Sequence, residues 1–238
     1  MAKTQNEVVG YARGDILVLL DADVIPIQHD FLDNITKPIR EDASVGCVGA
    51  ATIPLPPQNL IERDIANSHY MKQHLYRRIR SGNNVYLCHG RGRAFSRALY
   101  REFHWPDNCP EDAYSYFTCK TKGFKFVYTT NAGVYFRSPA TLADHVLQST
   151  RFFAGIRRLT ELFDPDYVRQ EYVIPRLLLL KTLLRYLKRN PFSTPMYLAI
   201  TIYVRLSRTN SNIFKSRFRT ASSSKRIILY KGQKLSRI

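Results

Sequence analysis

Two carboxylates one residue apart, Asp21 and Asp23, directly follow a run of five aliphatic residues, Ile16–Leu20. Such a run predicts a strand that is buried on both faces, as in a parallel sheet. Ligands of open α/β sheets bind beyond the carboxyl ends of the strands, where this pair falls. The pair could hold Mg²⁺ or Mn²⁺, hard cations that complete their coordination with water and substrate phosphates. The alternative is a chance pair, because turns after strands favour Asp.

A second acidic pair, Glu111 and Asp112, opens a predicted helix over residues 113–122, which Gly123 is expected to end. Acidic side chains at a helix N-terminus are stabilised by the helix dipole. Helix capping therefore explains this pair as well as a catalytic role does.

Glycine and arginine alternate in the segment Gly90-Arg91-Gly92-Arg93-Ala94, which follows a predicted short strand, Val85–His89. Glycine lets the backbone approach a ligand closely, and the arginines offer positive charge. A plain turn with solvated arginines explains the segment equally well when it is taken alone.

A third polar group lies on a predicted helix that opens at Thr141 and carries His145, Gln148, Arg151 and Phe152. A histidine on one helix face is more often structural than a metal ligand. This helix therefore adds candidate residues without assigning them a chemistry.

The rest of the chain alternates helical and extended patterns, which predicts an α/β fold. Pro26 is expected to end the first strand, Gly14 to cap the first helix and Asn59 to cap a long helix. Helices are expected over residues 1–13, 30–40, 59–80 and 96–103, and strands over 45–53, 124–129 and 132–137.

The charge of the chain is unevenly distributed. Its hydrophobic content of 45% and charged content of 23% are ordinary for a globular domain, but its formal charge of +17 is not. Residues 1–150 hold 17 basic and 15 acidic residues, a net +2, and residues 151–238 hold 19 and 4, a net +15. A basic excess of this kind predicts an anionic partner, either a membrane leaflet or a nucleic acid.

The four cysteines, Cys47, Cys88, Cys109 and Cys119, form no Cys-x-x-Cys pair. Because no signal peptide is recognisable, a reduced cytosolic setting is expected. No apolar run reaches the roughly 20 residues needed to span a bilayer.

The basic part contains an amphipathic pattern within residues 172–189. Basic residues fall along one helical side and leucines along another: Lys181, Arg185, Lys188 and Arg189, against Leu177, Leu180, Leu184 and Leu187. This pattern is typical of a helix that lies in a membrane interface, although a helix packed on a protein core shows it too. A second apolar patch follows at 195–206, and residues 207–238 have the composition of a flexible basic tail.

Three signals stand in a fixed order: Asp21-Ala22-Asp23, Glu111-Asp112 and Gln148-Ser149-Thr150-Arg151-Phe152. In this order the chain resembles the family 2 glycosyltransferases, including their membrane-associated, synthase-like members. Those enzymes carry Asp-x-Asp at a strand end, a later Glu-Asp pair and a Gln-x-x-Arg-Trp box. The resemblance covers about residues 3–160 and implies a GT-A-type, Rossmann-like α/β fold. Phe152 replaces the Trp of the box, which argues against processive polymer synthesis.

The resemblance implies roles for the matching acidic residues. Asp21 and Asp23 would contact the nucleotide-sugar donor, with Asp23 the more direct ligand of Mg²⁺ or Mn²⁺. Asp112 would be the general base that takes a proton from the acceptor hydroxyl, and Glu111 would orient it.

The resemblance also implies roles for the helix that opens at Thr141. Gln148 and Arg151 would bind the diphosphate or the acceptor end, and Phe152 would lie on the acceptor side. His145 is a weaker candidate metal ligand. On the strand side, Gly90, Arg91 and Gly92 are assigned to the acceptor.

The implied reaction moves a sugar from a nucleotide-diphosphate sugar, taken to be a UDP-sugar, to a hydroxyl of a glycan or a lipid-linked acceptor. One base without a second carboxylate nucleophile suits a single inverting displacement. A divalent cation on Asp23, together with Arg151, would offset charge on the departing diphosphate.

The chain departs from the family at its start, because the strands that hold the nucleotide base are not recognised in it. The expectation is a truncated or split enzyme whose strand 16–20 leaves an apolar sheet edge open to a separate N-terminal half. The predicted domains are a partial GT-A domain at 1–165, amphipathic helices at 166–210 and a basic tail at 211–238. The expected location is the cytoplasmic face of a membrane, as a peripheral or weakly integral protein.

Two other functions compete with this interpretation. Haloacid-dehalogenase-like phosphatases also place Asp-x-Asp after an apolar strand, but the later metal motif of that family is not matched here. A non-catalytic basic protein that binds anionic lipid or nucleic acid would explain the basic part, though not residues 1–160.

Overall fold

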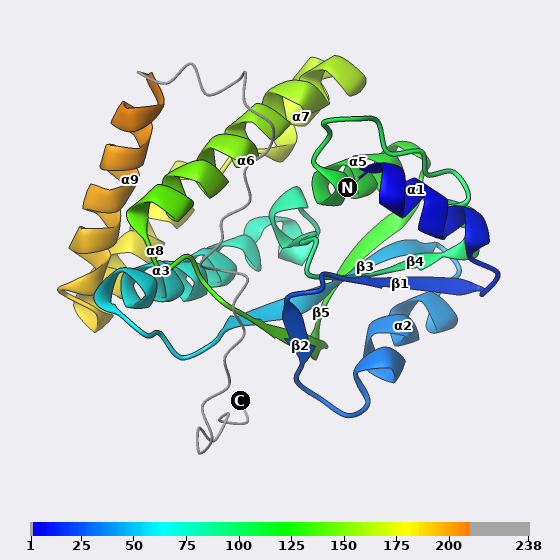
Figure 1. Cartoon of the computed structure of the whole chain (residues 1–238), viewed down its shortest axis with the longest axis horizontal. Helices are drawn as coiled ribbons and strands as arrows, with labels where there is room; N and C mark the ends of the chain where they lie inside the picture. Colours follow the sequence, from blue (N-terminus) through cyan, green and yellow to red (C-terminus); the bar gives the residue numbers. More distant parts are fainter. Residues whose placement is uncertain (1, 210–238) are drawn as a thin grey trace.

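The computed structural model describes residues 2–209, with side chains described for residues 3–206. The strands of this part form one mixed sheet in the order β1-β4-β3-β5-β2 (Figure 1). The strands are β1 (Ile16–Leu20), β2 (Val24–Pro26), β3 (Val45–Pro54), β4 (Gly92–Ser96) and β5 (Lys125–Phe136). The α-helices are α1 (Ala2–Tyr11), α2 (Phe31–Glu41), α3 (Leu60–Tyr76), α4 (Arg97–Tyr100), α5 (Glu111–Thr121), α6 (Leu142–Leu162), α7 (Pro165–Glu171), α8 (Arg176–Arg189) and α9 (Ser193–Thr209).

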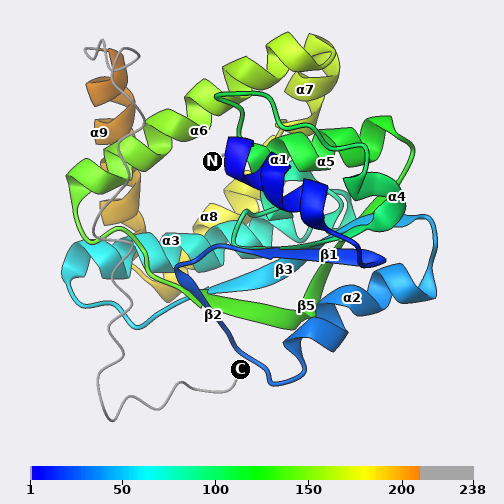
Figure 2. The same cartoon turned by 45° about the vertical axis from the view of Figure 1, so that its right-hand side comes forward.

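The sheet is covered on both faces, as Figure 2 shows: α2 lies on one face, and α1, α4, α5 and α6 lie on the other. Successive strand side chains point to opposite faces, so neighbouring residues enter different cores. Val48 and Ala94 pack with Phe31 and Ile35 of α2. The larger core, on the α5 side, is rich in aromatic side chains and contains Cys47, Leu87, Phe95, Trp105, Tyr116, Phe117 and Phe126.

The first strand differs from its prediction. β1 is an edge strand of the described sheet, pairs antiparallel with β4, and is only half-buried along Ile16–Leu19. The expectation of a strand buried on both faces of a parallel sheet was therefore wrong, because only β3 and β5 pair in parallel. The predicted open edge beside the Asp-x-Asp strand agrees with this place in the strand order.

The segment before the glycines also differs. The expected strand at Val85–His89 is a 3₁₀ turn, η2 (Val85–Leu87). The strand begins at Gly92 instead: Gly92, Arg93 and Ala94 lie in β4, between β1 and β3. Gly90 and Arg91 form a turn, and the second half of the alternation, Gly92 and Arg93, belongs to an interior strand.

Smaller differences concern element ends. Pro26 ends β2 and pairs with Val134, which is tolerated because β2 is the other edge strand. β5 runs through Asn131 without a break, and α1 ends at Tyr11, before Gly14. The predicted helix cap at Asn59 is confirmed, since its side chain accepts a hydrogen bond from the Glu62 amide at 2.9 Å.

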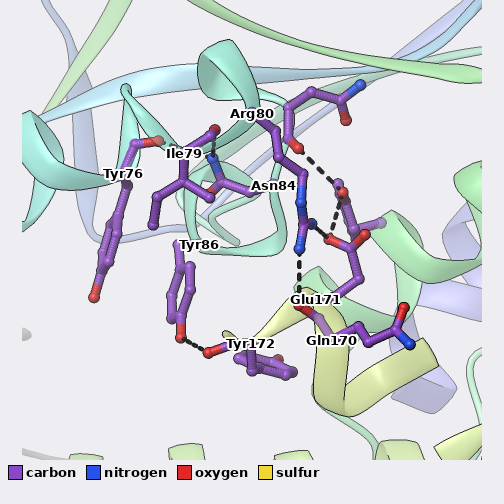
Figure 3. Close-up of polar contacts among 10 residues, drawn as sticks. Tyr76, Ile79, Arg80, Asn84, Tyr86, Gln170, Glu171 and Tyr172 are labelled. Atoms are coloured by element: carbon purple, nitrogen blue, oxygen red, sulfur yellow. Dashed lines mark hydrogen bonds and ion pairs between the residues drawn. The ribbon is translucent and has the colours of Figure 1, made fainter. Parts of the chain in front are cut away.

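Polar contacts join the connection after α3 to α7 (Figure 3). Arg80, in the 3₁₀ turn η1 (Ile79–Gly82), has a left-handed φ of 49°. Its guanidinium pairs with Glu171 and donates to the Gln170 carbonyl at 2.8 Å. The Tyr116 hydroxyl of α5 donates to the same Glu171 carboxylate at 2.9 Å. These bonds join η1, α5 and α7.

The helices after residue 165 pack on α3 and α6: α8 and α9 contact α3, and α7 and α9 contact α6. Within residues 2–209, no helix combines the length and the apolar composition that crossing a membrane requires. The three-part domain division stays a prediction, and the proposed basic tail at 211–238 lies outside the described residues.

Candidate active site

The two acidic pairs, far apart in the sequence, meet beside Gly90. Asp21 follows the end of β1, and its amide approaches the Arg91 carbonyl at 3.5 Å. Glu111 is the first residue of α5. A Cβ built on Gly90 would lie 3.6 Å from both Asp21 Oδ2 and Glu111 Oε1. A glycine at position 90 therefore leaves room between the two carboxylates.

Asp112 belongs to the same group of charges. Its carboxylate acts electrostatically on Asp21, Glu111 and Arg91. Its Oδ1 accepts a hydrogen bond from the Ala113 amide at 2.7 Å, which limits rotation of the carboxylate. Within the described residues no donor binds its Oδ2, so this oxygen is available to an acceptor hydroxyl.

Burial and mutual repulsion shape the charge states of these acids. Burial raises the pKa of Asp21, Arg93 opposes that rise, and Asp23 adds to it. Burial also raises the pKa of Glu111, and the adjacent Asp112 raises it further. Carboxylates held this close favour binding of a cation, because a cation removes the repulsion.

Arg91 faces the same acidic group. Burial lowers the pKa of its guanidinium, and Asp21, Asp23 and Asp112 act in the opposite direction. The guanidinium carbon lies 3.7 Å from the centre of the Phe136 ring, which fixes it as a cation–π pair. Arg91 was assigned to the acceptor, but the structure places it next to the residues assigned to the donor and the base.

Of the other residues assigned to the acceptor, Gly90 lies beside the acidic group, and Gly92 and Phe152 lie in different surroundings. A Cβ on Gly92 would lie 3.0 Å from the Ala50 Cβ, so this glycine serves the close approach of β4 to β3. Phe152 is 45% exposed on α6, and its ring lies 6.0 Å from that of Tyr172. An exposed aromatic ring can stack against an acceptor, whereas the buried Gly92 cannot reach one.

Helix α6 approaches the start of α5 through a glycine. A Cβ on Gly155 would lie 3.0 Å from Cγ of Pro110, the residue before Glu111. Gln148 and Arg151 precede Gly155 by seven and four residues, so they lie on the same side of the helix. Both are half-buried, and α6 thus presents them on the side from which it contacts α5.

His145, proposed as a third metal ligand, is in a different environment. It is 8% exposed, and burial, followed by the charge of Lys72 on α3, lowers its pKa to about 4. Within residues 2–209, no group of three or more His, Cys, Asp or Glu side chains is arranged to hold a metal. Asp21 and Asp23 are two carboxylates, the ligand type that a divalent cation prefers, and a diphosphate and water would have to supply the remaining ligands.

The sequence predicted no role of its own for Arg93, but the structure places it in contact with the start of α5. Arg93 is fully buried, and Nη1 donates to the Glu111 carbonyl at 3.0 Å and to Ser115 Oγ at 3.1 Å. Tyr172 was also missed, and its ring contacts Phe152. The only sequence signal for Arg93 was its neighbourhood of glycines, and Tyr172 had none.

Comparison with solved structures gives a partial likeness. The mannosyltransferase PcManGT from Pyrobaculum calidifontis, solved in complex with GDP-Man and Mn²⁺, is 17% identical to the chain, with a TM-score of 0.49. The match covers 87% of this chain and 55% of the mannosyltransferase, so the chain spans about half the length of that structure. No curated protein sequence matches the chain.

The family follows from a match to a family model. Residues 16–220 match the glycosyl transferase family group 2, a span that includes both acidic pairs and all of α6. This match confirms the predicted resemblance, and the mixed sheet between helical layers agrees with the expected GT-A-type α/β fold. The chain therefore belongs to the family 2 glycosyltransferases.

Proposed function

We propose that this chain carries the catalytic site of a glycosyltransferase that moves a sugar from a nucleotide-diphosphate sugar to a hydroxyl acceptor. The observation that carries the proposal is the meeting of Asp21 and Glu111 at Gly90, with Asp112 adjacent. These acids come from two elements that are about 90 residues apart in the sequence. The proposal assigns the donor to the acids at the end of β1 and the base to the start of α5.

Asp112 is the proposed general base. Its Oδ1 is held by the Ala113 amide, and its Oδ2 can accept the proton of the attacking hydroxyl. Glu111, the neighbour of Asp112 in the sequence, would help to orient the acceptor. With Asp112 as the base and none of the other carboxylates assigned as a nucleophile, a single displacement would invert the anomeric carbon.

The proposed reaction must also offset the negative charge that develops on the departing diphosphate. Asp21 and Asp23 would hold a divalent cation, which when bound supplies positive charge to the diphosphate oxygens. Arg91 faces both carboxylates and can bind the same oxygens. Arg151 lies on the α6 side that approaches α5, where it can close the site over the leaving group.

The Asp112→Asn variant tests this function. The substitution preserves size and the hydrogen bond from Ala113 but removes the base, so turnover should fall by roughly 10²–10⁴-fold. Donor affinity, measured by calorimetry, should stay close to that of the wild type, since the donor side is untouched. The matched control is Asp107→Asn in the exposed loop before α5, which should leave both values unchanged.

The result decides the assignment as follows. If Asp112→Asn retained wild-type turnover, Asp112 would not be the base. If the wild-type chain transferred no sugar from any nucleotide-diphosphate sugar, in the presence of Mg²⁺ or Mn²⁺, the proposed activity of this chain would be wrong.

We further propose that α8 and α9 attach the enzyme to an anionic membrane surface, where a lipid-linked or surface glycan acceptor would be found. The leucines of α8 are exposed: Leu177 at 64%, Leu180 at 54%, Leu184 at 52% and Leu187 at 41%. Helix α8 contains five basic residues and no acidic one. An exposed apolar face bordered only by positive charge is complementary to anionic lipid.

A further inference from the structure

The carbonyl of Glu111 is an unusual hydrogen-bond acceptor. Three side-chain donors reach it: Arg93 Nη1 at 3.0 Å, Trp105 Nε1 at 3.1 Å and Ser115 Oγ at 2.6 Å. Ser115 Oγ in turn accepts from Arg93 and Trp105, both at 3.1 Å. All three side chains are at most 1% exposed. We call them the α5 clamp.

The α5 clamp holds the start of α5 through a carbonyl oxygen. The residue before α5 is Pro110, which makes no side-chain capping bond. The clamp binds the first carbonyl of the helix, and α1 in turn binds Trp105 of the clamp. Asn6 of α1 binds Trp105 twice, donating to its carbonyl at 3.0 Å and accepting from its amide at 2.9 Å.

In the part of the chain that the structure describes, Arg93 has no carboxylate in direct contact with its guanidinium. Among the described residues it forms no ion pair, its Nε has no hydrogen-bond partner, and its guanidinium carbon lies 5.6 Å from the centre of the Phe95 ring. Burial of an unpaired guanidinium is unfavourable, and an apolar side chain of similar volume often stabilises such a site. The positive charge instead acts on the carboxylates of Asp21 and Glu111. This arrangement indicates that the charge serves the acidic group and not the stability of the fold.

We infer that Arg93 is a positioning residue of the proposed reaction, which holds the start of α5 so that Glu111 and Asp112 face Asp21. The inference rests on the proposed function and adds a residue to it. Arg93 acts through the helix and through its charge, because the base itself is Asp112. A cavity of about 300 Å³ reaches Arg93 and is also lined by Asp21, Gly90 and the α1 residues Thr4, Gln5 and Val8.

The clamp contains its own reporter, because Trp105 is the single tryptophan of the chain. The test compares Arg93→Met, Arg93→Lys and Ser115→Ala with the wild type, and uses Arg97→Met as the control. Arg97 follows β4 and bonds to the Gly14 carbonyl, away from the clamp. The measurements are the indole N–H resonance of Trp105, kcat and donor KM.

Arg93→Met should shift the indole resonance and lower kcat by about 10–100-fold, the loss expected when a base is misplaced by a fraction of an ångström to an ångström. Donor KM should change far less than kcat. Arg93→Lys should recover part of kcat, because it restores the charge. Free guanidinium ion should partly restore kcat of Arg93→Ala through the cavity, with no effect on Arg97→Ala.

An unchanged indole resonance and an unchanged kcat in Arg93→Met would overturn the inference. A kcat loss that neither lysine nor free guanidinium relieves would also overturn it, since the role would then be structural. If Arg93→Met does not fold, Arg93→Lys and Ser115→Ala carry the same comparison. If the wild type shows no transfer, the proposed function fails, and the Trp105 resonance still tests the clamp separately.

Discussion

At the scale of single residues, the site is a balance between repelling acids and buried arginines. Asp21 and Glu111 both have raised pKa values, chiefly because of burial. Positive charge comes from Arg93, which lies in β4, and from Arg91, which lies in the turn just before β4. Such a group would be unstable without cations, so it is suited to receive a metal-bound diphosphate.

His145 offers a test of a structural role against a metal role. Burial lowers its pKa to about 4 from a normal 6.5, so the folded state binds its proton less readily than the unfolded state. Unfolding therefore takes up a proton as the pH falls below 6.5, and the wild type loses stability down to about pH 4. His145→Gln lacks this loss, so its melting temperature relative to the wild type should rise between pH 6.5 and pH 4.

The measurement is thermal unfolding of both proteins at steps across that pH range. A difference in melting temperature that is constant with pH would contradict the assignment of a buried neutral histidine. Addition of Mn²⁺ should not change the difference, because the charged neighbour of His145 is Lys72 and not Asp21.

At the scale of elements, the decisive contact is the crossing of α6 over the start of α5. Gly155 contacts Pro110, and the acidic pair Glu111-Asp112 begins at the next residue. The bonds of Arg80 to Gln170 and Glu171 attach α7, which packs on α6, to the connection after α3 (Figure 3).

Gly155→Ala tests this crossing. Alanine normally stabilises a helix interior by about 0.5–1 kcal/mol relative to glycine. At position 155 the new methyl group would lie 3.0 Å from a rigid proline ring, so the substitution should destabilise the protein by about 1–3 kcal/mol and lower turnover.

The matched control is Gly10→Ala in α1, where a Cβ meets no atom within 4 Å. This variant should keep or raise the free energy of unfolding measured by urea denaturation. Equal stabilisation by both substitutions would show that α6 can move away from α5 without cost.

At the scale of the whole molecule, the basic excess and the acidic site lie in different parts of the sequence. The near-neutral part contains the acidic site, and the basic part follows it with α8 and α9 exposing apolar side chains. The two lie side by side through α3 and α6, as Figures 1 and 2 show.

Vesicle cosedimentation tests this attachment. The wild type should bind vesicles that contain phosphatidylserine more strongly than vesicles of phosphatidylcholine alone, and added salt should weaken the binding. A Leu180→Glu, Leu184→Glu double variant should lose most of the binding. Leu32→Glu, at an equally exposed leucine of α2 on the other face of the sheet, should not. Retention on DNA without vesicle binding would refute the lipid surface.

The sequence alone determined the features that depend on neighbours along the chain. The apolar run before Asp21, the cap at Asn59 and the acidic start of α5 are local patterns, and all were found. The order of the motifs also determined the family, which the family match confirms.

Only the tertiary structure decided which strand lies beside which and what each buried charge touches. The antiparallel edge position of β1, the interior position of β4 and the clamp of Arg93 on Glu111 depend on contacts between distant segments. A run of aliphatic residues reads the same in an edge or an interior strand. An arginine between glycines likewise reads the same whether water or a helix start receives its hydrogen bonds, because the receiving atoms lie 18 or more residues away in the sequence.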